Sequence, residues 1–183
     1  MPRNRRPRDR EEKRGEIVAA AARLFTEAGY DNTSMAKVAA SAGVTTNTIY
    51  WYFTDKDALL VGVLDQVLGE GLAAAALHAE APWVDQVLWA VEQLEQYNRL
   101  VTVVHARASA SPLIEAWHTS FHELMDSIMA EGFRGVGVAE ADLAAMNRIG
   151  TFVVEGLLMH PHTGPNRREI VELLARPRRG GSA

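Results

Sequence analysis

The chain has 183 residues, of which 48% are apolar, and a formal net charge of -4. These values are typical of a soluble globular protein with one domain, or with a small domain and a larger one. The absence of cysteine excludes a disulfide framework and thiolate chemistry. No apolar run approaches the roughly 20 residues of a membrane-spanning helix, and no apolar signal core follows the basic N-terminus. We therefore expect a cytoplasmic protein without a membrane partner.

The charge is divided unequally along the chain. Residues 1–14 carry seven Lys or Arg against three acidic residues, whereas residues 61–183 carry nine basic against fifteen acidic residues. A basic end on an acidic body localises affinity for nucleic acid. We predict that residues 1–15 form a disordered basic arm that reaches the minor groove of DNA. A solubilising tail is the alternative.

A stripe of apolar residues at helical spacing predicts a first helix over residues 10–28, ended by Gly29. This stripe is expected to be core rather than a binding surface. It consists of Ile17, Ala21, Leu24, Phe25 and Ala28.

Residues 33–53 have the pattern of two short helices joined by a glycine turn, which is typical of a helix-turn-helix. Thr33 or Ser34 can cap the first helix. Gly43 supplies the positive φ that a tight turn between helices needs. Small Ala39 allows the two helices to approach each other closely.

The second short helix follows Thr45, whose hydroxyl can cap it. Ile49 and Phe53 are its inward positions, and the helix is too short to persist without their packing. Its outward face is then free, and hydroxyls, an amide and aromatic rings suit phosphate oxygens and base edges. The outward residues are Thr46, Asn47, Thr48, Tyr50, Trp51 and Tyr52. An ordinary helical hairpin with a polar outer face is the alternative.

A third helix is predicted from Asp55 to about His78, capped by Thr54 or Asp55. Lys56 in its first turn is unfavourable for the helix dipole, which prefers anions at that end. An approaching phosphate would explain a cation there.

Residues 16–62 resemble the DNA-binding domain of the TetR family of transcriptional repressors. The resemblance rests on Ala21, Leu24, Phe25, Gly29, Tyr30, Ser34, Val38, Ala39, Ala42, Gly43, Val44, Ile49, Tyr50, Phe53, Lys56, Ala58 and Leu59. It implies that the second helix of the motif lies in the major groove of double-stranded operator DNA. Ala36, Asn47 and Tyr52 depart from the family pattern, which bears on the operator sequence and not on the docking mode.

The resemblance also implies which residues touch DNA. Tyr50 and Lys56 would contact phosphates, and residues of the second helix would lie nearer the bases. The predicted DNA-binding residues are Ser34, Lys37, Thr45, Thr46, Asn47, Thr48, Tyr50, Trp51, Tyr52 and Lys56.

The rest of the chain shows helical spacing and no useful alternating pattern, so we predict an all-α fold. The N-terminal three-helix helix-turn-helix DNA-binding domain, residues 16–62, is followed by a C-terminal helical domain for ligand binding and dimerisation. That second domain covers residues 63–176, and residues 177–183 would be a flexible tail. Its helices are expected over 83–107, 113–133, 140–159 and 166–174.

The resemblance implies that the second domain binds a small-molecule effector. Aromatic and methionine side chains suit an adaptable apolar pocket, although a helical core uses the same residues. The candidates, which include two histidines, are Trp89, Tyr97, His105, Trp117, Phe121, His122, Met125 and Phe152.

The last two helices are the predicted homodimer surface, because the family interface is usually made there. A small DNA reader gains from twofold pairing on a palindromic site. The candidates are Val153, Gly156, Leu157, Ile170 and Leu173, with intramolecular core as the alternative.

The sequence carries no catalytic signature, neither a P-loop nor a nucleophile turn, so we expect no enzyme, no catalytic residue and no cofactor. His118 and His122 lie four residues apart on one helix face, a spacing that can hold a transition metal. Pocket lining or surface is the favoured interpretation, and we predict no metal site.

These observations predict a homodimeric, TetR-like repressor that binds palindromic operator DNA and is released by an effector. The alternative is a helical protein–protein interaction module in which the helix-turn-helix is only architectural.

Overall fold

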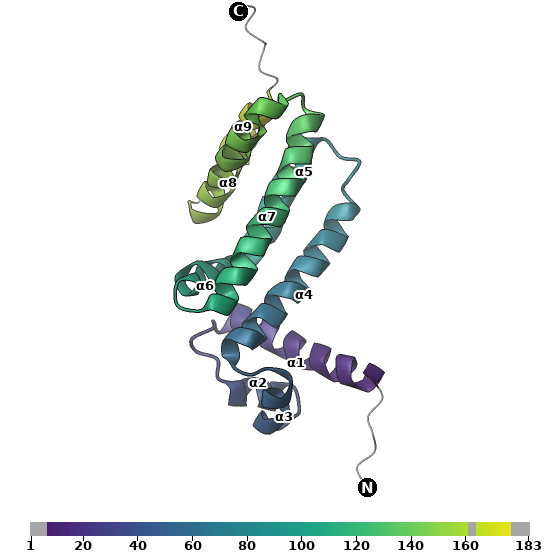
Figure 1. Cartoon of the computed structure of the whole chain (residues 1–183), viewed down its shortest axis with the longest axis vertical. Coiled ribbons are helices and arrows are strands. Elements are labelled where there is room, and N and C mark those ends of the chain that lie inside the picture. The colour runs from purple at the N-terminus through teal and green to yellow at the C-terminus, as the bar shows by residue number, and fades with distance from the viewer. Residues whose placement is uncertain (1–6, 161–163, 177–183) are drawn as a thin grey trace, which may run out of the picture. The chain divides into compact units, whose positions relative to one another are not determined.

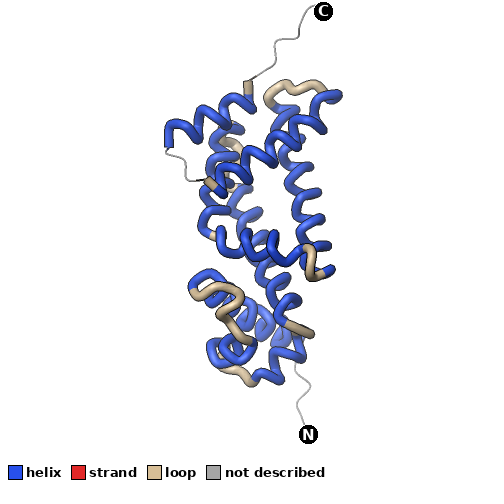
Figure 2. Tube along the Cα trace, turned by 90° about the vertical axis from the view of Figure 1, so that its left-hand side faces the viewer, coloured by secondary structure: helices blue, strands red, loops and turns tan. Residues whose placement is uncertain are grey.

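A computed structural model describes residues 7–160 and 164–176. These residues form helices joined by short connections and contain no strand, so the all-α prediction is confirmed (Figures 1 and 2). The elements are α1 (Pro7–Glu27), α2 (Met35–Ser41), α3 (Thr46–Tyr52), α4 (Lys56–Ala76), α5 (Trp83–Gln96), α6 (Asn98–Ala108), α7 (Pro112–Gly135), the 3₁₀-helix η1 (Glu140–Asp142), α8 (Leu143–Met159) and α9 (Gly164–Ala175).

Helix α1 begins at Pro7, three residues before the predicted start. Proline is favoured at the first helical position, where its missing N–H is not needed. Residues 7–15 are therefore helical and not part of a disordered arm. The rest of the predicted arm, residues 1–6, and the predicted tail, 177–183, lie outside the described residues.

The described residues divide into two compact units. The first unit contains the chain up to Gly71 together with Arg99–Trp117, and the second contains Leu72–Asn98 and the chain from His118 onward. The first unit is thus larger than the predicted 16–62 domain, because it also contains α4 up to Gly71 and most of α6. Long-range contacts agree with this grouping. Arg107 of α6 forms hydrogen bonds with Asp57 of α4, and Trp117 Nε1 of α7 donates a hydrogen bond of 2.8 Å to Asp65 Oδ1 of α4.

The core of the first unit is formed by α1, α2, α3 and the first half of α4. Its side chains have less than one tenth of their surface exposed, which is where burial of apolar area stabilises most. They include Ile17, Val18, Ala21, Phe25, Val38, Ile49, Phe53, Leu59, Leu60 and Val63.

Helix α4 is long and apolar enough, by length and composition, to cross a membrane. The expectation that no segment approaches that length was therefore wrong. Its residues Leu59, Leu60, Gly62, Val63 and Leu64 are buried in the core of the first unit, and 28% of its most apolar window is buried.

The predicted single helix over 83–107 is two helices. Helix α5 ends at Gln96, Tyr97 leaves the helical conformation with φ -108° and ψ 19°, and α6 starts at Asn98. Asparagine competes for backbone hydrogen bonds and favours helix ends. The apolar spacing continues across the break, so periodicity alone did not reveal it.

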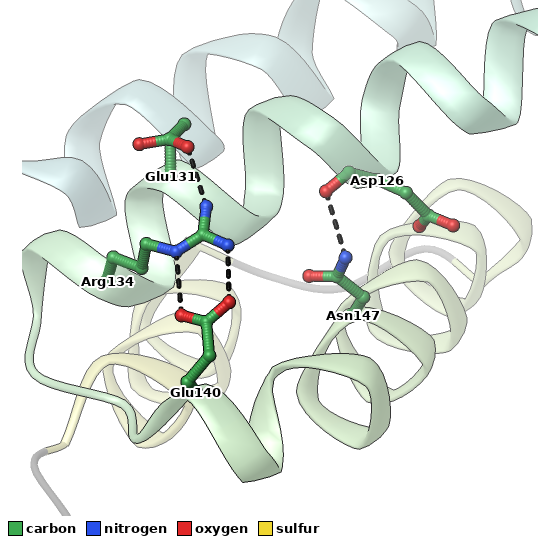
Figure 3. A network of polar contacts seen from close by, with 5 residues as sticks. All are labelled: Asp126, Glu131, Arg134, Glu140 and Asn147. Atoms are coloured by element: carbon green, nitrogen blue, oxygen red, sulfur yellow. Dashed lines mark hydrogen bonds and ion pairs between the residues drawn. The ribbon is translucent and has the colours of Figure 1, made fainter.

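In the second unit, α5, α8 and α9 pack around two apolar clusters, one on Val91 and Leu157 and one on Phe133 and Met146. Polar contacts fix the turn from α7 into α8 (Figure 3). Arg134 forms two hydrogen bonds of 2.8 and 3.0 Å with the Glu140 carboxylate.

The same helices are joined a second time further along α8. Asn147 Nδ2 donates a hydrogen bond of 2.9 Å to the Asp126 carbonyl oxygen (Figure 3). Across the unit, Arg167 of α9 forms a bidentate ion pair with Glu95 of α5. These contacts hold α8 and α9 in place.

Candidate nucleic-acid interface

Helix α2 is capped by Ser34, one of the two N-cap residues predicted from the sequence. Ser34 Oγ accepts a hydrogen bond of 3.2 Å from the amide nitrogen of Lys37, which leaves its own hydrogen free to donate to an anion. Thr33 is instead buried, and its hydroxyl donates to the Gly29 carbonyl oxygen at 2.9 Å. The Lys37 ammonium lies 2.8 Å from the Asn32 carbonyl oxygen, so it is anchored beside the loop that precedes α2.

The turn between α2 and α3 has the predicted chemistry. Gly43 has φ +64°, which a residue with a Cβ rarely adopts. The amide nitrogen of Val44 donates to the Ala39 carbonyl oxygen at 3.0 Å, closing the end of α2. Ala39 is buried at this contact, as its small size suggested.

Thr45 caps α3, and its hydroxyl oxygen accepts from the amide nitrogen of Thr48 at 3.2 Å. The two threonine hydroxyl oxygens are also 2.9 Å apart, so part of their hydrogen-bonding capacity is used inside the helix. Ile49 and Phe53 are buried, which confirms the inward positions and sets the outward face of α3.

Large aromatic side chains dominate that outward face. Tyr50 is 52% exposed and Trp51 is 63% exposed, and Asn47 is exposed beside them. Thr46 and Tyr52 are half-buried, as is Thr48. No acidic residue occurs between positions 32 and 54, so a phosphate approaching α2 and α3 meets no carboxylate from these helices.

Trp51 is supported from two sides. The Tyr52 ring meets it edge-on with centroids 4.9 Å apart, and the Arg10 guanidinium lies 4.5 Å from its ring centroid. Arg10 belongs to α1; in the sequence it fell where the predicted arm, residues 1–15, and the predicted first helix, residues 10–28, overlap. A contact across forty residues leaves no local pattern, so the sequence held no signal for it.

Lys56 begins α4, and its predecessor Asp55 caps the helix by accepting from the Ala58 amide nitrogen at 2.8 Å. The Lys56 ammonium lies 3.9 Å from the centroid of the Tyr30 ring. Desolvation in this half-buried place lowers the pKa of Lys56. The ring face gives the cation a partner in the free protein, which the helix-dipole argument alone did not anticipate.

The predicted effector residues are divided between the two units. His105 and Trp117 belong to the first unit, and the other six belong to the second. Phe152 is 69% exposed, so it does not line an enclosed pocket. Trp89 stacks on His78 with centroids 4.7 Å apart. The half-buried residues Tyr97, Phe121, His122 and Met125 complete the set.

Three of the five predicted dimer residues, Val153, Ile170 and Leu173, line an open apolar groove on α8 and α9. Gly156 is half-buried. Leu157 is only 2% exposed and packs in the core of the second unit, so it cannot reach a partner chain. For Leu157, the intramolecular alternative holds.

The two histidines of α7 do lie together. His118 Nε2 and His122 Nε2 are 3.0 Å apart, and the nearest Glu155 carboxylate oxygen is 4.0 Å from His122. Within the described part of the chain, no group of three His, Asp or Glu side chains is arranged to hold a metal ion.

The helix-turn-helix region is similar in sequence to known proteins. Residues 17–63 match the family model for bacterial regulatory proteins of the tetR family. The HTH-type transcriptional regulator HbdR of Aromatoleum sp. (strain CIB) is 47% identical over 58 residues, which are 32% of this chain and 25% of HbdR. BetI of Burkholderia thailandensis is 39% identical over 72 residues, 39% of this chain and 37% of BetI. The matched part is thus about a quarter to a third of these curated relatives.

The fold extends the likeness along the chain. A putative transcriptional regulator from Saccharomonospora viridis, solved in complex with choline, superposes with a TM-score of 0.72 and 19% identity over 90% of this chain and 94% of that one. The helical second unit therefore has a counterpart in solved regulators. Residues 17–63 therefore form a DNA-binding domain of the kind found in the tetR family of bacterial regulatory proteins.

Proposed function

We propose that the chain is a repressor that binds palindromic operator DNA as a homodimer and is released by a small-molecule effector. The observation that carries the DNA part is α3 itself. Ile49 and Phe53 anchor it in the core, while Tyr50 and Trp51 remain exposed on the other side. A seven-residue helix held in this way presents a fixed face to a groove.

The outward groups of α3 suit a duplex. The exposed Tyr50 hydroxyl can donate to a phosphate, and Asn47 offers both a donor and an acceptor to a base edge. Trp51, backed by Arg10, offers a large apolar face for a thymine methyl. The proposed location is the cytoplasm, where the DNA is.

A mobility-shift titration tests the proposal, with the region upstream of the chain's own gene and with duplexes that the chain selects from a randomised pool. We expect saturable binding that weakens as salt rises, because bound phosphates release counterions. Absent binding, or binding insensitive to salt, would favour the interaction-module alternative.

Replacing Tyr50 or Lys56 by alanine is expected to weaken DNA binding about tenfold, since each loses one charge-assisted contact to a phosphate. For Lys56→Ala, the slope of log affinity against log salt should also fall by about one. The control is Leu77→Ala, which removes an exposed apolar side chain far along the sequence from α3. An interaction module would respond to none of these changes in a DNA titration.

The homodimer part rests on α8 and α9. Phe152 and Val153 lie three and four residues after Ile149 on α8, so each of them is a neighbour of Ile149 on the helix surface. Ile149 and Val153 line the groove, while Phe152 and Leu173 are exposed large apolar residues. An apolar face of this kind, formed from two adjacent helices, suits a self-complementary twofold interface.

Phe152→Glu is expected to convert the dimer into a monomer, because the interface would then bury an unpaired carboxylate. Light scattering after size exclusion measures the mass directly. Leu77→Glu is the matched control, since Leu77 is even more exposed but lies outside α8 and α9. If the Phe152 variant kept the wild-type mass, α8 would not carry the interface.

The effector part rests on fold likeness. The Saccharomonospora viridis regulator was solved in complex with choline, so a protein of this fold can bind a small ligand, and we propose that the second unit of this chain does so. Such a ligand releases DNA only by binding the DNA-free state more tightly than the bound state.

A further inference from the structure

Five side chains of the first unit meet at the start of α4. The Tyr30 hydroxyl donates a hydrogen bond to the Asp57 carboxylate. Arg107 of α6 binds both oxygens of the same carboxylate, with hydrogen bonds of 2.9 and 2.7 Å. Ser111 adds a further hydrogen bond to Asp57. The Tyr30 ring has two cations near its centroid, Lys56 Nζ at 3.9 Å and the Arg107 guanidinium at 5.1 Å.

This arrangement leaves the charge of Lys56 intact. A ring face attracts an ammonium through its quadrupole but adds no opposite charge, whereas a carboxylate would neutralise it. Neighbouring residues on a helix ordinarily diverge, yet Lys56 and Asp57 converge on one ring. Arg107 and Tyr30 hold the Asp57 carboxylate by hydrogen bonds, and Arg107 offsets the attraction of Asp57 for Lys56.

Asp57 is an ionised carboxylate whose negative charge is compensated by its hydrogen-bond partners. Burial by itself would raise the pKa of Asp57, but the hydrogen bonds from Arg107, Tyr30 and Ser111 hold the pKa below its usual value. The side chains of Asp57 and Arg107 are 18% and 35% exposed, so the pair is partly shielded from water. Asp31 also attracts Lys56, and a second uncompensated carboxylate would add to that attraction.

We propose that Arg107 is a positioning residue for DNA binding: by occupying Asp57, it keeps the Lys56 ammonium free to neutralise a DNA phosphate. The inference rests on the proposed DNA-binding function. Arg107 lies outside residues 17–63, the segment that matches the family model. The proposed role therefore belongs to a residue that is not part of the helix-turn-helix domain.

Removal of Arg107 would weaken DNA binding in two ways. The freed Asp57 carboxylate competes with the phosphate for Lys56, and it also repels a phosphate that approaches the start of α4. If the Asp57–Arg107 ion pair were only structural, replacing Asp57 would weaken DNA binding as much as replacing Arg107, because either substitution breaks the pair. The substitution of Asp57 therefore separates the two interpretations.

The test uses the full-length chain and the duplex that the wild type binds most tightly in the selection described above. Arg107→Gln is expected to weaken binding about tenfold and to lower the salt slope by about one, as Lys56→Ala does. Asp57→Asn alone should not weaken binding, and the double variant Asp57→Asn/Arg107→Gln should regain wild-type affinity and slope. Arg107→Lys, which keeps the charge, should lose less than Arg107→Gln.

Arg99→Gln is the matched control. Arg99 is an arginine of the same helix, and it also joins α6 to the helix-turn-helix region, by donating to the carbonyl oxygens of Thr26 and Glu27 at the end of α1. These hydrogen bonds go to the end of α1 and not to Asp57, so the loss of Arg99 should leave the salt slope unchanged.

Two results would overturn the inference. One is an Asp57→Asn variant as weak as Arg107→Gln, with no recovery in the double variant. The other is an Arg107→Gln variant that matches Arg99→Gln. Thermal unfolding of each variant shows that it is folded in the titration. A wild-type chain that fails to bind duplex DNA would refute the proposed function itself. The wild type is therefore measured before any variant.

Discussion

Replacing Ile49 by alanine is expected to lower the free energy of unfolding of the first unit by about 2–5 kcal/mol. The Ile49 side chain is 0% exposed and is the only buried residue within α3. A helix of seven residues has little stability of its own, so the lost contact and the cavity act directly on its attachment. Chemical denaturation followed by circular dichroism measures the change.

The neighbouring residue provides the control. Tyr50→Ala alters a side chain that is half exposed, so its stability should stay within about 0.5 kcal/mol of the wild type. The Ile49 variant should lose both stability and DNA affinity, whereas the Tyr50 variant loses affinity alone. An Ile49→Ala chain with wild-type stability would show that α3 is held by something other than this contact.

Gly132→Ala should destabilise the second unit by about 1–3 kcal/mol. A Cβ on Gly132 would lie 1.8 Å from Trp83 Nε1 and 2.4 Å from Trp83 Cδ1. The indole is rigid, and its ring packs on Phe133 with centroids 5.0 Å apart, so it cannot yield without disturbing the apolar cluster around Phe133. Thermal unfolding measures the effect.

Alanine substitutions at two other glycines provide a comparison for the stability loss expected at Gly132. Gly135 is in the same helix and has open space where a Cβ would lie, so Gly135→Ala should leave stability unchanged or slightly higher. At Gly150, a Cβ would lie 2.6 Å from Met129 Cε, the end of a flexible side chain that can move aside. We expect the loss for Gly150→Ala to fall between the other two. Equal losses at all three positions would contradict the steric explanation.

The helix-turn-helix was predictable because its determinants are local. The caps at Ser34 and Thr45, the positive φ of Gly43 and the inward spacing of Ile49 and Phe53 each involve residues within four positions of one another. Local hydrogen bonding and helical geometry decide such features, so one sequence contains them.

The break between α5 and α6 shows where periodicity fails. Val87, Val91, Leu100 and Val104 are all buried, on both sides of Tyr97. An apolar stripe reports burial but not the continuity of the backbone. The turn at Tyr97 carries no glycine or proline that would have marked it.

The remaining parts of the site come from distant positions. Arg107 reaches Asp57 across fifty residues, and Arg10 reaches Trp51 across forty-one. Such pairs depend on how helices pack, and a single sequence does not encode them in any window. The same holds for Leu157, whose burial could not be separated from an interface position by its apolar character alone.

The contact between Arg10 and Trp51 has a practical consequence for anyone who prepares the protein. A purification tag fused ahead of Met1 would be separated from Pro7, the first residue of α1, by six residues, and six residues span at most about 20 Å. Such a tag can reach the exposed aromatic face of α3. Binding constants should therefore be measured after the tag has been cleaved.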